Sequence, residues 1–597
     1  MKLRSKKPIY SLIFVCAGAV SATAQTPESS PTIAAKPQSV VAQLTEPPAA
    51  NFYTPTNLNR VGVQTAQPIS LSLADAIGRA LANNNDIEVS RDDVRFQDTR
   101  VTALEGVYDP VLTIAPTYTS TSSTFSQRTN DFRANAGLDK FFRKGGGTLS
   151  SFFNNNRTES AFAQAEATSG QLGTASTSAL YSSDLGLRYT QPLWRNFRVD
   201  SRRHAIYVAQ KNLEQTEQDF RLSATNTINS VQRAYWDYVY ALRNQQNTVA
   251  NVNLAKENLR QTEAKIEAGA AAPLERAEVA TELANREGDL LLATQQVSIA
   301  ENTLKQLVIR DPLSVEWSET FTPTDGPTFT LQPVNMDEAV KDALDNRFEL
   351  RRLKIQQEIN QADIKYYKNQ TKPQIDLNTG FHLNGLAAAG TAPGEATVNL
   401  LTNAQDLFLL NSLNTTRQAL GLSTISNPTF TTAAGQAFRF GGFNRSIANM
   451  FRSGAPNYSL GVTISFPFRN RTAKANLAGA RIQEHQLDAQ VRGQENGVIV
   501  EVRNAVQAVE TARQRVLTAQ RARENAEIQL EGERKLYENG KSTTFLLFQR
   551  ENTLTNARNA EIRAQTDYDK AVADLQRVTA TAFRANHIEV KSPLDPK

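Results

Sequence analysis

The chain repeats itself over most of its length, and each copy holds both helical and strand patterns. Three short segments recur at nearly equal offsets of 263, 275 and 271 residues. They are 73–83 and 336–346, 185–193 and 460–468, and 267–269 and 538–540. Because the offsets differ so little, we interpret them as one global duplication, which predicts a symmetric architecture.

Two segments carry the pattern of very long helices. Residues 201–267 and 471–538 contain no proline, and their apolar residues follow one another at spacings of three and four. At about 1.5 Å per residue each helix is roughly 100 Å long, which suits a coiled coil or a tunnel. Shorter helices are predicted at 71–105, 274–309, 336–369 and 543–583. Two of these helices placed end to end have about the length of one long helix; the pairs are 274–309 with 336–369 and 543–583 with 71–105. Two long helices and two such pairs predict four helical columns.

Between the helices the apolar period falls to two. The stretches from 111 onward, 184–193, 374–382 and 458–468 alternate polar and apolar residues over about ten positions, the length of a tilted strand that crosses an outer membrane. The connections 120–182 and 384–456 are rich in Ser, Thr, Asn and Gly, as external loops are. A hairpin pattern within 134–156 either adds two strands or folds inside its loop.

A proline stands at each predicted junction between a strand and a helix. Proline has no N–H to donate and disfavours helix in the preceding residue, so it separates a sheet ladder from a helix within one or two residues. The four junction prolines are Pro110, Pro192, Pro373 and Pro467.

The N-terminus has the pattern of an export signal. Residues 1–24 have a basic start, an apolar middle and a small-residue cleavage site, and residues 25–68 form a Pro/Ala/Ser-rich leader that we expect to be flexible. No later stretch approaches ~20 apolar residues, so we expect no transmembrane helix. The lone Cys16 lies in the signal, which excludes disulfides and cysteine metal sites from the mature chain. Cleavage removes four basic residues and lowers the net charge from +5 to +1, which gives no basis for a nucleic-acid partner.

These patterns together resemble the TolC-like outer-membrane efflux proteins over residues 69–583. The resemblance rests on the repeated helix start at Leu73 and Met336, on the strand ends Gln-Pro-Leu-Trp and Phe-Pro-Phe, and on the turns at Gly269 and Gly540. It implies a first repeat, 69–333, with strands in 111–193, a helix hairpin at 201–309 and a strap at 311–333. The second repeat, 334–583, has strands in 374–468 and a hairpin at 471–583, and a tail follows at 584–597.

The resemblance implies an α+β membrane protein that forms a homotrimer. Three protomers, with four strands per protomer, would share one 12-stranded barrel in outer-membrane lipid, continued by a helical barrel in the periplasm. Such a channel is a passive exit duct, joined by a periplasmic adaptor to an inner-membrane RND or ABC pump. Closure of the barrel by several protomers is also favoured physically, because an open sheet edge is costly in lipid and a closed ring removes it. Six strands per protomer would raise the barrel to 18 strands, which we favour less.

The family resemblance also implies a gate at the periplasmic tip. Gly269 and Gly540 correspond to the helix turns, Glu275 to an acidic gate position and Tyr537 to a gate tyrosine. Where relatives often carry arginine this chain has Ser542 with Lys541 beside it, and the constricting aspartates are replaced by Leu546 and Gln549. We therefore predict a weaker gate, held by Glu275 and Tyr537 with Lys541 as a substitute cation. The alternative for Glu275 is a solvated helix carboxylate.

The main rival is a soluble periplasmic coiled-coil adaptor or scaffold. An adaptor would lack two long Ser/Thr/Asn/Gly loops between strands, so we favour the channel. The four histidines show no metal spacing and no acid, base and nucleophile come together, so we expect neither an enzyme nor a metal or other cofactor. The cargo and the class of pump are left open by the sequence.

Overall fold

The protein is represented by a computed structural model that describes residues 60, 64–122, 128–159, 179–269, 272–329, 333–390, 392, 394–452 and 456–594. The chain divides into two units after Ala50, and only the second contains described residues. The predicted signal 1–24 and most of the leader lie outside the described residues. Within the described part, no helix has both the length and the apolar character needed to cross a membrane.

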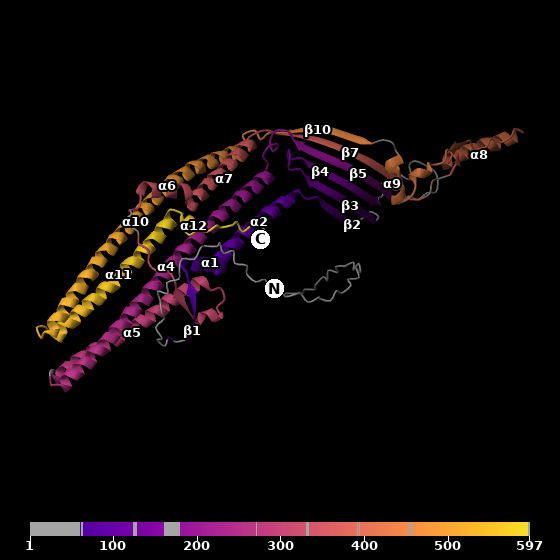
Figure 1. Cartoon of the computed structure of the whole chain (residues 1–597). Coiled ribbons are helices and arrows are strands. Elements are labelled where there is room, and N and C mark those ends of the chain that lie inside the picture. The colour runs from indigo at the N-terminus through magenta and orange to yellow at the C-terminus, as the bar shows by residue number, and fades with distance from the viewer. Residues whose placement is uncertain are drawn as a thin grey trace, which may run out of the picture. The chain divides into compact units, whose positions relative to one another are not determined.

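The principal helices fall into two sets that share one order along the chain (Figure 1). The first set is α1 (Leu73–Asn83), α2 (Asn85–Glu105), α4 (Ser201–Glu267) and α5 (Pro273–Val308). The second set is α6 (Met336–Asn346), α7 (Phe348–Gln370), α10 (Arg471–Glu538) and α11 (Thr544–Val578). The bounds of α4 and α10 confirm the long helices that the heptad pattern predicts. The common origin of the two halves stays a prediction.

Two of the predicted shorter helices are each broken in two. Asn84 separates α1 from α2, and its side-chain oxygen caps α2 by accepting from the backbone nitrogens of Asp86 and Ile87 at 2.9 and 3.3 Å. Arg347 separates α6 from α7 with an extended backbone (φ −58°, ψ 128°). These breaks let short columns bend around the long helices, because α2 packs on α4 and α7 packs on both α4 and α10.

One sheet of six strands joins the two halves. Its strands are β2 (Val111–Thr121), β3 (Thr129–Phe141), β4 (Thr148–Thr158), β5 (Leu180–Pro192), β7 (Gln374–Ala388) and β10 (Asn457–Ser465). Their order is β10-β7-β5-β4-β3-β2, and every pair is antiparallel. The expectation of four strands per protomer is therefore wrong. The hairpin β3–β4 inserts between β2 and β5 and pairs with both along nearly its whole length, so its backbone groups are satisfied within the ladder.

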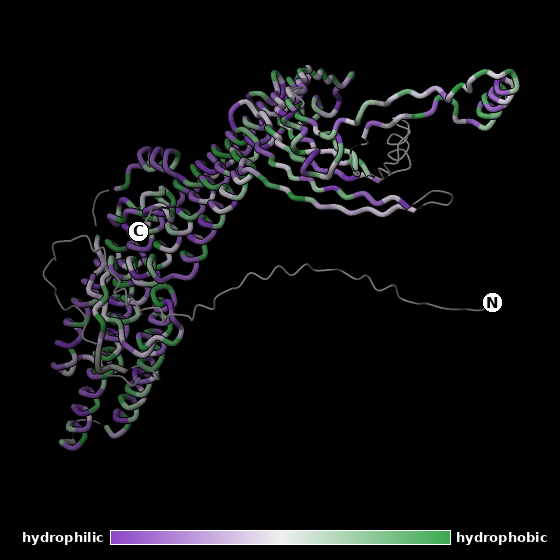
Figure 2. The backbone as a smooth tube through the Cα atoms, turned by 90° about the vertical axis from the view of Figure 1, so that its right-hand side faces the viewer, coloured by the Kyte–Doolittle hydropathy of each residue, from purple (hydrophilic) through white to green (hydrophobic). Residues whose placement is uncertain are grey.

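The register gives the sheet one apolar and one polar face, because side chains of neighbouring residues point to opposite sides. Along the strands of Figure 2 the colour accordingly alternates. One cross-strand row of the apolar face runs through all six strands: Leu112, Leu138, Ser151, Leu187, Phe381 and Tyr458. A row of the polar face runs through Val111, Asp139, Ser150, Arg188, Gly380 and Ser459. This alternation is typical of a sheet with lipid on one side and water on the other.

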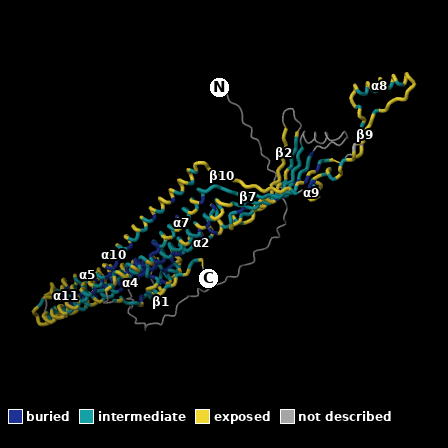
Figure 3. Tube along the Cα trace, turned by 90° about the horizontal axis from the view of Figure 1, so that it is seen from above, coloured by how far each residue is buried: buried dark blue, intermediate teal, exposed yellow. Residues whose placement is uncertain are grey.

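The two outer strands of the sheet, β2 and β10, each have one edge without a partner in the described chain. Both strands are exposed along their whole length. Figure 3 shows the exposed strands and, by contrast, the buried middle of α4. The core instead lies around α4, where Ile228, Val231, Tyr235, Tyr238 and Leu242 are buried as the heptad stripe predicts.

A short two-stranded sheet clamps the middle of α4. The strands β1 (Gln64–Leu71) and β6 (Glu319–Pro323) pair in parallel. The short helical turn η2 (Val315–Trp317) precedes β6 along the chain. The hydroxyls of Tyr235 and Tyr238 donate to the carbonyls of Leu71 and Phe321 at 3.2 and 2.5 Å. The end of the predicted leader, 64–68, is therefore part of a strand, and the predicted strap 311–333 contains another.

A buried ionic cluster fixes this clamp to α5. Lys305 is fully buried, and its ammonium group donates to the carbonyls of Trp317 and Glu319 at 2.9 and 2.5 Å. Glu301 lies 3.2 Å from Lys305, accepts from the backbone nitrogen of Phe321 at 3.0 Å and also pairs with Arg60. Each buried charge therefore has an opposite charge beside it.

The connection between β7 and β10 folds into small elements of its own. They are β8 (Ala396–Asn399), α8 (Ala404–Ala419), β9 (Thr429–Thr432), η3 (Ala437–Arg439) and α9 (Phe443–Arg452). The remaining elements are η1 (Gly106–Tyr108) and α12 (Ala582–Ala585). In the predicted tail 584–597, Ser592 donates to Glu217 on α4 at 2.9 Å.

Candidate functional site: the helix turns and the seam between helix pairs

The turn between α4 and α5 ends α4 with a left-handed glycine. Gly269 has φ +72°, and its backbone nitrogen donates to the carbonyl of Ile266 at 2.9 Å. A Cβ at this position would touch nothing within 4 Å, so the backbone angle and not the space favours glycine. After residues 270 and 271, which lie outside the described residues, α5 begins with Pro273 in its first turn.

The turn between α10 and α11 is built in the same way. Gly540 has φ +67° and donates to the carbonyl of Tyr537 at 3.0 Å. The next residue, Lys541, donates its backbone nitrogen to the carbonyl of Leu536 at 2.9 Å, which completes a Schellman motif. Thr543 then caps α11 by accepting from the backbone nitrogen of Leu546 at 3.4 Å.

Tyr537 joins the two helix pairs close to these turns. The ammonium of Lys265, in the last turn of α4, donates to the Tyr537 hydroxyl at 3.1 Å and lies 4.5 Å from the centre of its ring. Thr544, in the first turn of α11, donates to the same hydroxyl at 3.4 Å. Tyr537 thus receives a cation–π contact and two hydrogen bonds from neighbouring helix ends.

The predicted link between Glu275 and Tyr537 is absent within one protomer. Glu275 lies half-buried in the first turn of α5, where a carboxylate favours the positive end of the helix dipole. Among the described residues its side chain makes no hydrogen bond or ion pair, and neither does the exposed Lys541. A contact of either residue with a neighbouring protomer stays a prediction.

A polar seam runs between α4 and α11, up to the turns. Asn247 donates to Asn559 at 2.9 Å, and Thr555 donates to Asn251 at 3.1 Å. Nearer the turns, Asn258 donates to Glu551 at 3.4 Å. Burial raises the pKa of the Glu551 carboxyl above its usual value. A seam of amides and hydroxyls contrasts with the valine and alanine core that packs α10 on α11.

A groove of about 870 Å³ lies between α5 and α11 beside this seam. Its lining includes Glu278 and Glu282 from α5 and Phe545, Phe548 and Gln549 from α11. Arg286 bridges the two helices, because its guanidinium donates to Glu282 at 2.8 Å and also to Asn552. Gln549, at a position where relatives are expected to carry aspartate, lines the same groove as Glu278 and Glu282 of α5.

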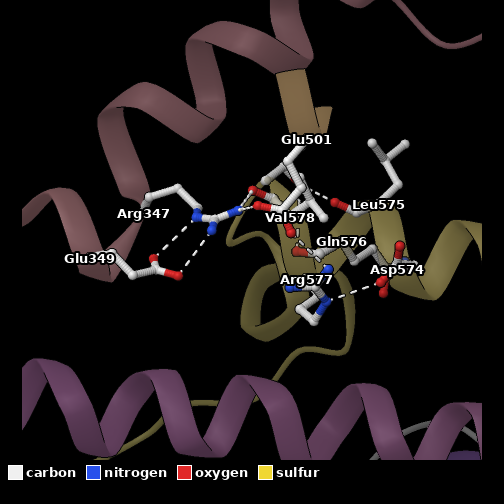
Figure 4. Close-up of polar contacts among 9 residues, drawn as sticks. Arg347, Glu349, Glu501, Asp574, Leu575, Gln576, Arg577 and Val578 are labelled. Atoms are coloured by element: carbon white, nitrogen blue, oxygen red, sulfur yellow. Dashed lines mark hydrogen bonds and ion pairs between the residues drawn. The ribbon is translucent and has the colours of Figure 1, made fainter. Parts of the chain in front are cut away.

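A second network holds the break between α6 and α7 against the long helices (Figure 4). Arg347 pairs with Glu349 at 2.9 Å and with Glu501 of α10 at 2.7 Å, and donates to the carbonyl of Val578 at 3.1 Å. Arg577 of α11 also pairs with Glu501 at 2.9 Å. Burial opposes ionisation of Glu501, but hydrogen bonds from both arginines outweigh it and hold the pKa of this carboxyl below its usual value.

The four predicted prolines all stand at ends of strands. Pro110 and Pro373 immediately precede β2 and β7, Pro192 is the last residue of β5, and Pro467 follows β10 by two residues. Two asparagines that the sequence analysis missed complete these junctions, Asn196 before α4 and Asn470 before α10, with φ +67° and +42°. Both bind the end of α7: Asn196 accepts from Gln370 at 2.8 Å, and Asn470 donates to the carbonyl of Thr371 at 3.1 Å.

Lys265, Arg286 and the seam were not predicted from the sequence. The run of Asn and Gln from 244 to 258 was a usable signal, because amides on an otherwise apolar stripe indicate a polar helix contact. For Arg286 no signal was available, since its partner Asn552 lies 266 residues away.

A sheet with one apolar face, attached to helices of 67 and 68 residues, is typical of a membrane channel protein with a long helical extension. The sequence model of the family described as Outer membrane efflux protein matches residues 76–308 and 425–581. The chain belongs to this family. The family accordingly places the chain in the outer membrane. No curated protein sequence gives a significant match.

Several solved structures have the same fold. The outer-membrane channel OprN is similar with a TM-score of 0.54 and 16% identity, over 90% of this chain and 98% of that chain. CmeC from Campylobacter jejuni gives 0.54 and 12%, over 91% and 99%. VceC from Vibrio cholerae gives 0.53 and 14%, over 85% and 95%. At such identities the likeness concerns the fold alone.

Proposed function

We propose that three copies of this chain close one barrel in the outer membrane and serve as the passive exit duct of a tripartite efflux or type I secretion system. The proposal is supported above all by the six-stranded sheet, which has an apolar face, a polar face and two unpaired edges. In lipid each unpaired backbone group costs several kcal/mol, so the sheet needs closure. Three sheets of six strands give a barrel of eighteen strands.

The strand directions are compatible with such closure. From the helix end of the sheet β2 runs outward, and β10 returns toward α10. When β2 of one protomer meets β10 of the next, the new pair is antiparallel like every other pair in the sheet. A head-to-tail contact of this kind forms a ring when the rotation closes.

The turns and the seam supply the gate in this proposal. The α10–α11 pair meets α4 through amides, hydroxyls and the Lys265–Tyr537 contact, which exchange with water at small cost. Docking of a periplasmic adaptor and its inner-membrane RND or ABC pump on the helix ends would shift the two pairs and open the tip. Energy for transport would come from that pump, and the cargo would depend on it.

The experiment for the assembly is native mass spectrometry of the protein extracted from fractionated membranes. A mass of three mature chains from the outer-membrane fraction is the expected result. A monomer or dimer in the soluble periplasm would overturn the proposal and favour the coiled-coil scaffold.

The gate residue Glu275 has a test of its own. In Glu275→Gln, we expect a higher resting conductance of the reconstituted channel, because a carboxylate contact between protomers is lost. The matched control is Glu287→Gln on the same helix, an exposed carboxylate of α5 that pairs at 3.7 Å with Lys256. Equal closure of both variants would assign Glu275 to the solvated helix surface.

A further inference from the structure

The helix α9 lies on the apolar face of the sheet, at the strand ends away from the long helices. The ring of Phe443 is 4.9 Å from that of Tyr181 and 6.2 Å from that of Phe132, and both partners belong to the apolar face. Opposite α9 stands Gly385, where a Cβ would lie 1.8 Å from the carbonyl oxygen of Ser446. The helix is thus seated directly on the strand backbone.

What α9 covers is a polar interruption of the apolar face. The register aligns Asn155, Ser183 and Gly385 across three strands. The hydroxyl of Ser183 lies 2.6 Å from that of Ser446 and donates to Asn155 at 2.7 Å. Ser183 and Ser446 are 1% and 0% exposed. In a barrel these polar groups would face lipid, and α9 satisfies and buries them.

The outward side of α9 and η3 presents three arginines and apolar side chains. Arg439, Arg445 and Arg452 are exposed, and none forms an ion pair within the described residues. The guanidinium groups of Arg439 and Arg452 lie 5.9 and 4.6 Å from the centre of the Phe438 ring. Phe451 is 65% exposed. The sequence holds no Asp or Glu between Asp406 and Glu484, so the positive charge is not offset locally.

We propose that Arg439, Arg445 and Arg452 form a binding surface for the phosphate groups of outer-leaflet lipid. The inference rests on the proposed barrel, which turns the apolar face toward hydrocarbon and places α9 at the outer rim. An amphipathic helix with cations beside aromatic and aliphatic side chains suits a membrane interface. Arginine matches phosphate oxygens with its planar fork of donors. Phe451 enters the acyl region while the guanidinium groups stay at headgroup depth.

The test compares lipid binding by the intact channel and by a triple variant. The probe is lipid A, a phosphorylated glycolipid, titrated onto the detergent-extracted full chain and counted by native mass spectrometry. In Arg439→Gln/Arg445→Gln/Arg452→Gln we expect binding weaker on the order of 100-fold, because each basic residue near an anionic surface contributes about fivefold. The triple change to Lys keeps the charge and should retain most of the binding.

The control variant removes the same charge elsewhere. Arg481, Arg492 and Arg521 are exposed on α10 and form no ion pair among the described residues, so their triple change to Gln should leave lipid A binding unchanged. Phosphatidylcholine and inorganic phosphate should neither bind strongly nor compete. Equal lipid A binding by the wild type and the α9 variant, measured on a trimer of correct mass, would overturn the inference. Failure of the proposed function is distinct from this, since it appears as the absence of the trimer itself.

Discussion

The two halves of the chain differ most in what lies between their first and last strands. Between β2 and β5 the first half forms the hairpin β3–β4, which joins the sheet. Between β7 and β10, which pair directly, the second half forms α8, α9 and the small β8–β9 ribbon. An insertion can therefore widen the sheet or cover its face. The difference is set by whether the inserted backbone finds ladder partners on both sides.

A similar contrast appears halfway along the helices. In the first half Glu301 and Lys305 are buried within the clamp, at 1% and 0% exposure. In the second half Glu501 and Arg577 are 37% and 26% exposed at the α6–α7 break. Charges without access to water depend on their partners far more than hydrated charges do.

The largest expected effect comes from breaking the buried cluster. Lys305→Met leaves Glu301 buried with only part of its compensation, so we expect the free energy of unfolding to fall by about 3–5 kcal/mol. Arg577→Gln in the second half should cost about 1 kcal/mol or less, because water replaces the lost partner. Thermal melting of the extracted protein, followed by circular dichroism, measures both. Equal losses of stability would show that burial does not make the first network more dependent on its partners than the second.

A pH-dependent effect follows from Asp569 on α11, whose carboxyl accepts a hydrogen bond from Thr328 at 3.1 Å. Burial raises the pKa of Asp569 from 3.8 to about 7. Because the folded pKa lies above the unfolded one, this contribution to stability is present below pH 4 and is lost as pH rises through about 7. Asp569→Asn should stabilise the protein at pH 8 by about 2–4 kcal/mol and change it little at pH 4.

The check is the melting temperature of both proteins across that range. The wild type should approach the variant as the pH falls from 8 to 4. A constant difference between the two at every pH would contradict a titrating Asp569.

Alanine substitutions in the two helix turns should destabilise the protein by similar amounts, and by less than the changes above. Gly269→Ala and Gly540→Ala each place a Cβ at a positive φ, which costs about 1 kcal/mol. We expect faster amide hydrogen exchange in the last turns of α4 and α10, because the left-handed backbone that ends each helix becomes strained. Gly288→Ala, within α5 where nothing lies within 4 Å of the added Cβ, is the matched control and should not increase exchange.

The last prediction, a change in channel conductance, tests the comparison of the two halves directly. Deleting β3 and β4 leaves two strands in each half and would let β2 pair with β5, which run in opposite directions. Since barrel diameter grows roughly linearly with strand number, pore area and open conductance should fall to roughly half. An unchanged conductance in an assembled trimer would mean that the hairpin does not line the pore.

The long helices and the existence of most strands could be predicted, because both depend on local periodicity. The place of β3–β4 could not, since the same hairpin pattern suits a loop or a sheet and only pairing with β2 and β5 decides. The break at Asn84 had a local signal in the run of three asparagines from 83 to 85. The break at Arg347 had none, because Glu501 and Val578 that hold it are distant in sequence.

The candidate site divides in the same way. Gly269 and Gly540 could be placed from sequence because a helix end at a glycine is a local event. The partner of Tyr537 could not, since Lys265 reaches it across 272 residues. The contact of α9 with Gly385 is equally non-local, and a ten-residue helix in a polar loop gives little periodic signal.

The open edges of β2 and β10 have a consequence for biogenesis. If three chains close one barrel as proposed, a chain that reaches the membrane alone carries two unpaired strand edges, which are costly in lipid. We therefore expect folding and assembly to occur together. The yield of mature channel should then depend steeply on how many chains are exported at once. A chain with one edge blocked would enter assemblies that can never close, and would act as a dominant inhibitor of its normal copies.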